Sequence, residues 1–353
     1  MIKVCDLFKR YINKISKKRY MFDSQILPVF AGLFIIVFII SLITTKFWIK
    51  RAKQAGLTGK DIHKKEDVHV AESGGIAIIL SFIIGVLIYI AIRVFFLNAS
   101  SQLTPILALL TAVLIGGMIG LIDDILGWKL GLKQWQKPLL TLLIAAPIVA
   151  INIGNHIMSI PFLGQINVGL WYPFLIVPGF IIVGANGFNM LAGYNGLEAF
   201  QGVLILSALS IISALTGATW VSVIGFVMVA ALFGFLCFNK YPSKIFPGDT
   251  LTYTVGTTAA ILAILSNNER FFVIIFIPYI IEFFLKFRGK FKKESFSQIQ
   301  ENNTLRTRYK KFYGLEHIAV RLLNKTKIKA TEKKVVIFIH LFQLLFILIA
   351  FLI

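Results

Sequence analysis

Residues 186–198 read NGFNMLAGYNGLE and interrupt two apolar runs at about 171–185 and 197–215. The stretch contains three asparagines, three glycines and a terminal carboxylate. Asparagine and glycine are common in tight connections, so a simple loop is one interpretation. The other interpretation is a polar binding surface between two membrane spans.

The composition identifies the class of protein. Of 353 residues, 57% are hydrophobic and only 15% are charged, against roughly 25% charged residues in soluble domains. A membrane span needs about 20 apolar residues. The sequence therefore predicts an all-α polytopic membrane protein with about ten transmembrane helices and cytoplasmic catalytic loops. The ten runs are approximately 27–48, 74–97, 103–122, 138–153, 171–185, 197–215, 219–238, 250–266, 270–286 and 335–353.

The fifth run is short and contains Pro173 and Pro178, which predicts a broken or kinked helix. Lysine and arginine then orient the spans, because short cytoplasmic loops are rich in them. Seven occur in 46–65 and fifteen in 286–334, whereas 152–170 has none. This asymmetry places the basic loops in the cytoplasm and both termini outside.

The chain divides into two predicted parts. Residues 1–26 form a basic amphipathic segment suited to the membrane interface, although its seven basic residues conflict with an outside location. Residues 27–353 form a single ten-helix catalytic domain with a basic cytoplasmic flap at 287–334. Cys5 and Cys237 lack the spacing of a disulfide or zinc framework. The net charge of +20 is confined to the loops, which favours topology and anionic lipid or substrate over nucleic acid.

Two adjacent carboxylates, Asp123 and Asp124, end the third run in GLIDDILGW. Such groups inside apolar sequence are costly unless a cation or hydrogen-bond donors meet them. Adjacent helical residues diverge by about 100°, so we expect one to face a ligand and the other to bind a lysine or backbone groups. An acidic helix end at the interface is the alternative. Lys129, Lys133 and Lys137 follow, and could neutralise phosphates or only reflect topology.

A third carboxylate, Asp249, opens the eighth run in FPGDT. It could be a helix cap, because acids are favoured at helix N-termini. It could also bind Mg²⁺, which prefers oxygen ligands and needs few protein side chains. The amide of Asn189 would then complete the metal site. Upstream, Glu72 precedes two glycines at the start of the second run and is either a substrate contact or a favourable partner of the helix dipole.

The flap at 287–334 offers Arg306, Arg308 and His317 as candidate ligands of a diphosphate. The alternative is a solvated basic surface that faces lipid headgroups. Successive spans end on alternate sides of the membrane. Counting them places this flap, Glu72, Asp123 and Asp249 on the same side as the stretch 186–198. Such convergence favours a binding site over unrelated loops.

Together these motifs resemble the polyprenyl-phosphate N-acetylhexosamine-1-phosphate transferases of the glycosyltransferase 4 type. The motifs are Asp-Asp after the third run, N-x-x-N-x-x-x-G-x-N-G-L-E after the fifth and G-D-T opening the eighth. LAGYNGLE is similar to the archaeal and eukaryotic UDP-GlcNAc:dolichyl-phosphate branch. The resemblance covers residues 45–285, and the flap departs from it because the family's H-R-x-P-R or histidine run is missing there.

The resemblance implies transfer of a HexNAc 1-phosphate from a UDP-sugar to a polyprenyl or dolichyl phosphate, with release of UMP. It implies Mg²⁺, with Mn²⁺ as an alternative, and an active site on the cytoplasmic face of a multi-pass protein, in the plasma membrane if the chain is archaeal. A homodimer would be compatible with it. The roles implied are catalysis by Asp123, Asp124 and Lys137, metal binding by Asp249 and Asn189, and substrate binding by Asn186 and Asn189. Beside the resemblance, we expect Asn195 and Glu72 to bind substrate, and Arg306, Arg308 and His317 to do so by their position in the flap alone.

Two other classes of protein remain as alternatives. A transporter or lipid carrier also uses broken helices and intramembrane polar groups, but it predicts polar sites near the bilayer midplane and related halves. A noncatalytic scaffold predicts no convergence of polar residues. Formation of a labelled lipid diphosphate would separate the enzyme from both.

Overall fold

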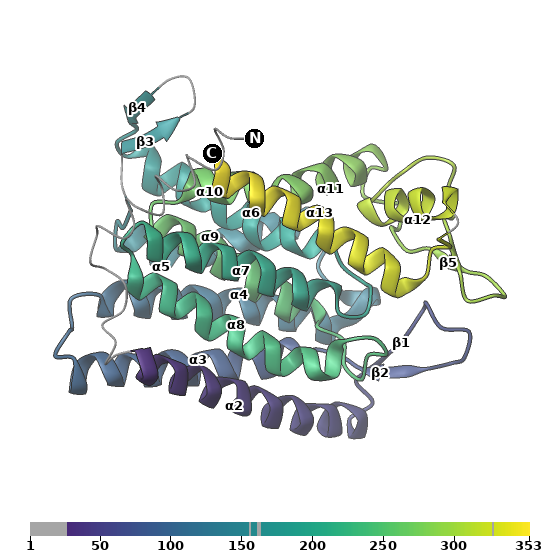
Figure 1. Ribbon diagram of the computed structural model, residues 1–353, viewed down its shortest axis with the longest axis horizontal. Helices are drawn as coiled ribbons and strands as arrows, with labels where there is room; N and C mark the ends of the chain where they lie inside the picture. Colours follow the sequence, from purple (N-terminus) through teal and green to yellow (C-terminus); the bar gives the residue numbers. More distant parts are fainter. Residues whose placement is uncertain (1–26, 155–156, 161–163, 327) are drawn as a thin grey trace, which may run out of the picture.

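The structure is a computed structural model that describes residues 27–154, 157–160, 164–326 and 328–353. The predicted amphipathic segment 1–26 lies outside the described residues. Long helices run alongside one another through most of the molecule (Figure 1). The helices are α2 (Leu27–Gln54), α3 (Gly75–Ala91), the π-helix η1 (Ile92–Phe96), α4 (Leu103–Leu130), α5 (Gln136–Ala150), the π-helix η2 (Tyr172–Ile176), α6 (Val177–Met190), α7 (Leu197–Leu215), α8 (Thr219–Asn239), α9 (Gly248–Leu265), α10 (Glu269–Ile275), α11 (Ile277–Arg288), α12 (Leu315–Lys325) and α13 (Glu332–Leu352).

The predicted helical membrane class is confirmed, but the count of ten spans is not. Within the described residues, seven helices are long and apolar enough to cross a membrane: α2, α3 with η1, α4, η2 with α6, α7, α8 and α13. The remaining predicted runs form α5, which is shorter, the threonine-rich α9 and the divided pair α10 and α11.

Two helical paths depart from regular α geometry. The run with Pro173 and Pro178 begins as the π-helix η2 and continues as α6, and each proline lies in a first turn, where the missing N–H costs little. The ninth run is interrupted at Phe276, whose φ of −91° and ψ of 0° separate α10 from α11. Both paths thus keep their backbone hydrogen bonds largely internal, as a membrane requires.

Helix α9 lies at the centre of the packing and contacts α4, α6, α7, α3 and α8. Most of its side chains are buried, so it is shielded by protein and tolerates polar residues. Thr254 and Thr258 donate their hydroxyls to backbone carbonyls one turn earlier. A Cβ at Gly256 would lie 2.1 Å from the carbonyl oxygen of Gly184, so glycine permits the close contact of α9 with α6.

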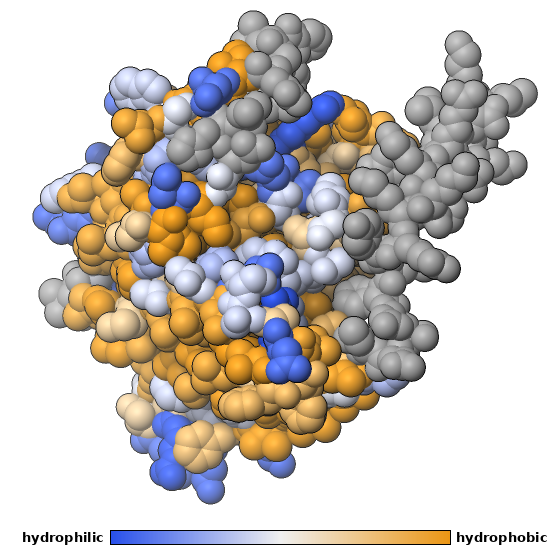
Figure 2. All heavy atoms as spheres, turned by 90° about the vertical axis from the view of Figure 1, so that its left-hand side faces the viewer, coloured by the Kyte–Doolittle hydropathy of each residue, from blue (hydrophilic) through white to orange (hydrophobic). Residues whose placement is uncertain are grey.

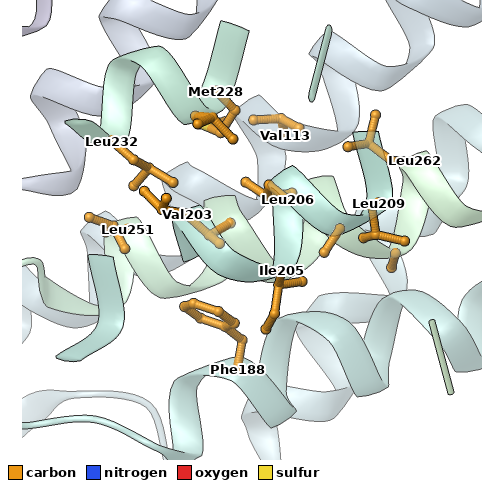
Figure 3. Close-up of a cluster of buried hydrophobic side chains, with 14 of the residues drawn as sticks. Val113, Phe188, Val203, Ile205, Leu206, Leu209, Met228, Leu232, Leu251 and Leu262 are labelled. Carbon is orange, nitrogen blue, oxygen red and sulfur yellow. The ribbon is translucent and has the colours of Figure 1, made fainter. Parts of the chain in front are cut away.

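Apolar side chains fill the space around α9. Figure 3 shows residues of α4, α6, α7, α8 and α9 that interlock in one buried cluster. Leu206, Met228 and Leu262 are completely buried within it. This packing fixes the start of α9, and with it Asp249, relative to α4. The labelled residues are Val113, Phe188, Val203, Ile205, Leu206, Leu209, Met228, Leu232, Leu251 and Leu262.

Short antiparallel hairpins lie at opposite ends of the helices. The pairs β1 (Thr58–Lys60) with β2 (His69–Ala71), and β5 (Gln298–Ile299) with β6 (Leu305–Arg306), share one end with α12, at the right of Figure 1. We call this the polar end. The pair β3 (Ile157–Ile160) and β4 (Gly164–Asn167) lies at the other end. That end, seen in Figure 2, has much hydrophobic surface with scattered hydrophilic residues.

Candidate active site

At the polar end, a lysine joins two carboxylates from different helices. Lys137 Nζ of α5 lies 2.7 Å from Asp123 Oδ2 of α4 and 2.7 Å from Asp249 Oδ2 of α9. The three side chains are 14%, 13% and 23% exposed, so water reaches them while protein covers most of their surface. The long-range fold brings together charges that are separated by up to 126 residues of sequence and places them where a soluble substrate has access.

The second aspartate of the pair holds the start of α9. Asp124 Oδ1 accepts the backbone N–H of Asp249 at 2.7 Å, and Asp124 Oδ2 accepts the hydroxyl of Thr250 at 2.6 Å and its N–H at 3.2 Å. A carboxylate in this position satisfies free N–H groups of the helix and interacts favourably with its dipole. Asp123 and Asp124 thus point to different partners, as expected for neighbouring helical residues.

Gly248 makes this approach of the carboxylate sterically feasible. Its φ of +71° lies in the left-handed region, and a Cβ there would lie 2.2 Å from Asp124 Oδ2. Any other residue would be strained and would also displace the carboxylate. The glycine in FPGDT is therefore needed to position Asp249.

Two amides at the end of α6 lie near Asp249, and one of them, Asn189, binds its carboxylate. Asn189 Nδ2 donates to Asp249 Oδ2 at 2.9 Å, and Asn189 Oδ1 accepts the Thr252 hydroxyl at 2.9 Å. Asn186 Nδ2 donates to the Thr141 hydroxyl at 2.9 Å, while Asn186 Oδ1 accepts the Tyr253 hydroxyl at 3.3 Å. These bonds fix the end of α6 against α5 and α9.

Two cavities flank Lys137, which lines both. The first has a volume of about 450 Å³ and lies between the start of α3, the end of α4 and the loop before α9. Its polar surface combines Glu72 with the two aspartates of α4. Because the carboxyl of Glu72 is partly buried, its pKa is raised. The lining residues are Glu72, Ser73, Asp123, Asp124, Gly127, Gly131, Leu132, Gln134, Lys137, Phe246 and Gly248.

The second cavity has a volume of about 350 Å³ and lies between α5, α6, α11 and the segment after α11. It combines aromatic rings with basic groups, and exposed apolar side chains of α5 and α11 lie next to it, including Leu139 and Phe284. This cavity therefore places charged groups next to the exposed apolar side chains of α5 and α11. The lining residues are Gln134, Lys137, Pro138, Asn186, Asn189, Met190, Ala192, Tyr253, Phe283, Lys286, Phe291, Lys293, Glu294, Ser295 and Phe296.

The structure distributes the predicted site residues over three regions. Asp123, Asp124, Lys137, Asn186, Asn189, Asp249 and Glu72 lie at the two cavities. Asn195 is buried beside Asp61, to which its Nδ2 donates at 3.0 Å. The three flap residues line neither cavity in the described part of the chain.

The flap residues have other partners. Arg306 is exposed on β6. Arg308 pairs with Glu294, which lines the second cavity. His317 is fully buried in α12, its Nδ1 accepts the N–H of Tyr313 at 3.2 Å, and burial lowers its pKa. Arg308 and His317 are therefore both linked to the second cavity, Arg308 through Glu294 and His317 through a hydrogen bond with the backbone of Phe296.

Sequence reasoning did not find the basic and aromatic groups of the second cavity. Lys286, Lys293 and Phe296 lie on α11 and on the flap, and their surroundings in sequence are ordinary basic and aromatic residues. Phe246 in the first cavity immediately precedes P-G-D-T and could have been found from that motif. The other three become neighbours of the site because α11 packs against α6 and the segment after α11 continues along the same cavity.

Comparison with known proteins identifies the family. Residues 106–267, which include both aspartates of α4, Lys137, Asn189 and Asp249, match Glycosyl transferase family 4. The chain is 35% identical over 325 residues to a Sulfolobus acidocaldarius protein provisionally named UDP-N-acetylglucosamine--dolichyl-phosphate N-acetylglucosaminephosphotransferase, covering 90% of this chain and 93% of the relative.

Two further relatives extend the comparison. A Saccharolobus solfataricus protein with the same provisional name is 35% identical over 292 residues, covering 82% of this chain and 87% of the relative. The phospho-N-acetylmuramoyl-pentapeptide-transferase of Streptococcus pyogenes is 29% identical over 261 residues, covering 70% and 76%. The similarity spans the helices that build both cavities as well as the motifs themselves. The chain therefore belongs to glycosyl transferase family 4.

Proposed function

We propose that the protein transfers N-acetylglucosamine 1-phosphate, or a related HexNAc 1-phosphate, from a UDP-sugar to a polyprenyl or dolichyl phosphate. The products are a lipid diphosphate sugar and UMP. The observation that carries this proposal is the Lys137 bridge between Asp123 and Asp249, which lies between a polar cavity and a second cavity beside exposed apolar side chains of α5 and α11. Two anionic substrates, one soluble and one lipidic, could meet at this point.

The chemistry of the two cavities supports a separate site for each substrate. The second cavity has Lys286 and Lys293 for a lipid phosphate, and Phe283 and Phe291 beside the apolar outer faces of α5 and α11 for the chain. The first cavity is more polar and has the aromatic ring of Phe246, which suits a nucleotide diphosphate. The substrates would then be joined beside Lys137.

Transfer is an in-line displacement on the phosphorus that carries the sugar. An oxygen of the lipid phosphate forms the new P–O bond, and the bond from this phosphorus to the bridging oxygen of UMP breaks, so that UMP leaves with the electron pair. Such a reaction depends mainly on positioning and on stabilising negative charge. Lys137 is placed to offset the repulsion between the two phosphates.

The two aspartates of α4 have positioning roles in this proposal. Asp123 Oδ2 binds Lys137, and Asp123 Oδ1 accepts the N–H of Leu132 at 2.5 Å, so both oxygens orient neighbouring groups. Asp124 holds the start of α9 and thereby Asp249. An attacking role for either carboxylate would require breaking these bonds.

The residues at Asp249 fit a Mg²⁺ ion. Asp249 and Asp123 supply carboxylate oxygens, rotation of the Asn189 amide would add a third oxygen, and the Lys137 ammonium already lies between the carboxylates as a cation would. When bound, Mg²⁺ would neutralise diphosphate charge. Mn²⁺ has the same ligand preference and could replace it.

The position of the site supports an enzyme over a transporter. The site lies at the polar end of the helices, beside the basic loops that predict the cytoplasmic face (Figure 1). A transporter would need its polar site near the midplane. The names of the archaeal relatives favour UDP-N-acetylglucosamine and a dolichyl lipid as substrates.

A direct assay tests the proposal. Purified protein in detergent is incubated with Mg²⁺, dolichyl phosphate and UDP-N-acetylglucosamine labelled in the sugar, and the lipid product and UMP are measured. We expect equal amounts of both, and Asp249→Asn should lower their formation at least 100-fold. Labelled UDP-glucose and UDP-N-acetylgalactosamine test the sugar. No lipid product with any of these donors, from protein that retains its fold, would refute the proposed function.

A further inference from the structure

A second buried ionic cluster lies at the polar end, formed by Asp61, Lys64, Asn195 and Glu332. Lys64 Nζ is 2.6 Å from Glu332 Oε2 and 3.4 Å from Asp61 Oδ2. Asn195 donates its Nδ2 to Asp61 Oδ2 at 3.0 Å and its backbone N–H to Glu332 Oε1 at 2.9 Å. Asp61, Asn195 and Glu332 are almost fully buried, so these bonds are shielded from water. We refer to these four residues as the clamp.

The clamp joins three segments that are remote in sequence. Asp61 and Lys64 belong to the β1–β2 hairpin, Asn195 to the loop between α6 and α7, and Glu332 to the first turn of α13. Along the chain, Asn195 is 134 residues from Asp61 and 137 residues from Glu332, and Lys64 is 268 residues from Glu332. Stacking of His63 on Tyr194, with ring centroids 4.2 Å apart, adds a second contact between hairpin and loop.

The clamp supplies its own cation. Asp61, His63 and Glu332 have ligand atoms within 4.8 Å of one another, a spacing that a metal ion could also use. However, the ammonium of Lys64 already lies between the two carboxylates. The other carboxylate oxygens accept N–H groups of His63 and Asn195. A structural role therefore agrees better with these contacts than a metal site does.

The loop that the clamp holds forms part of the second cavity. Met190 and Ala192 line that cavity. Between them and Asn195 lies Gly193, whose φ is +105° and whose N–H donates to Glu198 Oε1 at 2.6 Å. Gly196 follows with a φ of +82°. A loop with glycines on both sides of Asn195 has many accessible conformations when it is not bound, so its shape depends on contacts such as the clamp.

We infer that Asp61, Lys64 and Glu332 are positioning residues that hold the 190–196 loop in the shape that lines the second cavity, which is proposed to bind the lipid phosphate acceptor. This inference rests on the proposed function. The clamp itself borders a third cavity of about 440 Å³ that contains Lys64, Glu332 and Lys333. The donor is proposed to bind in the first cavity, and no residue of 190–196 lines that cavity. Loosening the loop should therefore affect the lipid much more than the donor.

Steady-state kinetics of clamp variants test the inference. Asp61→Asn keeps the shape of the side chain but removes its charge, and Lys64→Met leaves two carboxylates without their cation. In each we expect the KM for dolichyl phosphate to rise about tenfold, the effect of losing one charge-assisted hydrogen bond. The KM for UDP-N-acetylglucosamine should stay within about twofold. Lys64→Arg retains the cation and should restore most of the affinity for the lipid.

The same hairpin provides a matched control. Lys60 and Asp67 form an exposed ion pair at 2.8 Å, with side chains 58% and 69% exposed. Asp67→Asn removes a charge from the hairpin without touching the clamp, and surface pairs contribute little. It should leave both KM values unchanged. Equal increases in both KM values for Asp61→Asn, with a lower unfolding temperature, would indicate a general loss of structure and would overturn the inference.

Hydrogen exchange gives a readout that needs no activity. In substrate-free protein, amides of residues 190–197 should exchange at least tenfold faster in Asp61→Asn and Lys64→Met than in the wild type or in Asp67→Asn. Faster exchange in a protein that makes no lipid product would support the clamp's hold on the loop while refuting the proposed function. Unchanged exchange in both clamp variants would overturn the inference whatever the activity.

Discussion

Replacement of Lys137 by Met separates the two roles that its ammonium combines. In the structure this ammonium lies 2.7 Å from a carboxylate oxygen of Asp123 and 2.7 Å from one of Asp249. A divalent cation that binds these oxygens has to displace at least one of the contacts. Methionine has a similar length but no charge. We therefore expect Lys137→Met to bind metal more tightly and yet to lose turnover.

The geometry gives the size of the effect. A hydrogen bond to a charged group contributes roughly 1.5–3 kcal/mol. Because the three side chains are between 13% and 23% exposed, we take one such bond, about 2 kcal/mol, as the cost that lysine imposes on metal binding. This corresponds to roughly 30-fold tighter binding in the variant. The rate should fall at least 100-fold, because the charge that offsets phosphate repulsion is gone.

Electron paramagnetic resonance of free Mn²⁺ measures the affinity without any need for activity. The matched control is Lys133→Met, which removes an exposed lysine from the loop just before α5. It should leave both Mn²⁺ affinity and rate close to those of the wild type. An unchanged or weaker affinity in Lys137→Met would refute the reasoning that lysine and metal compete for the same oxygens.

Three other variants test separate parts of the structure. Gly248→Ala places a Cβ 2.2 Å from Asp124 Oδ2 at a positive φ, so activity should fall at least 100-fold. The control is Gly217→Ala, at a positive φ in open space, which should cost about 1 kcal/mol of stability but no activity. Equal activities of the two variants would contradict the steric argument. Glu316 is fully buried in α12, and burial raises its pKa well above its ordinary value. The folded protein therefore keeps a proton that the unfolded chain releases above about pH 4.5, so this contribution to stability is complete below that pH and is lost as pH rises toward the folded-state pKa. Glu316→Gln should raise the unfolding temperature more at pH 8 than at pH 5, and an equal change at both would exclude this titration. Lys286→Met should raise the KM for dolichyl phosphate about tenfold and leave the KM for the UDP-sugar within twofold, as measured from initial rates. A rise in the KM for the UDP-sugar alone would contradict the assignment of the second cavity to the lipid phosphate.

The sequence by itself determined the helical membrane class, and it predicted most of the residues that the structure brings together at the candidate site. Long apolar runs are local features, so composition is enough to predict that they form helices. Motifs on both sides of these runs identified Asp123, Lys137, Asn189 and Asp249, all of which lie together at one end of the helices. The count of ten spans was less secure, since α9 is shielded by protein and needs less hydrophobicity than a lipid-facing helix.

Only the tertiary structure decided how the polar residues pair. Both Asn189 and Asn195 come from one motif, yet Asn189 binds Asp249 while Asn195 binds Asp61 in the clamp. The flap residue His317 lines neither cavity and is buried in α12, where it reaches the second cavity only through the backbone of Phe296. The physical reason is that the hydrophobicity of a run depends only on adjacent residues. The partner of a buried charge depends on segments that are more than 100 residues apart in the chain and meet only in the folded protein.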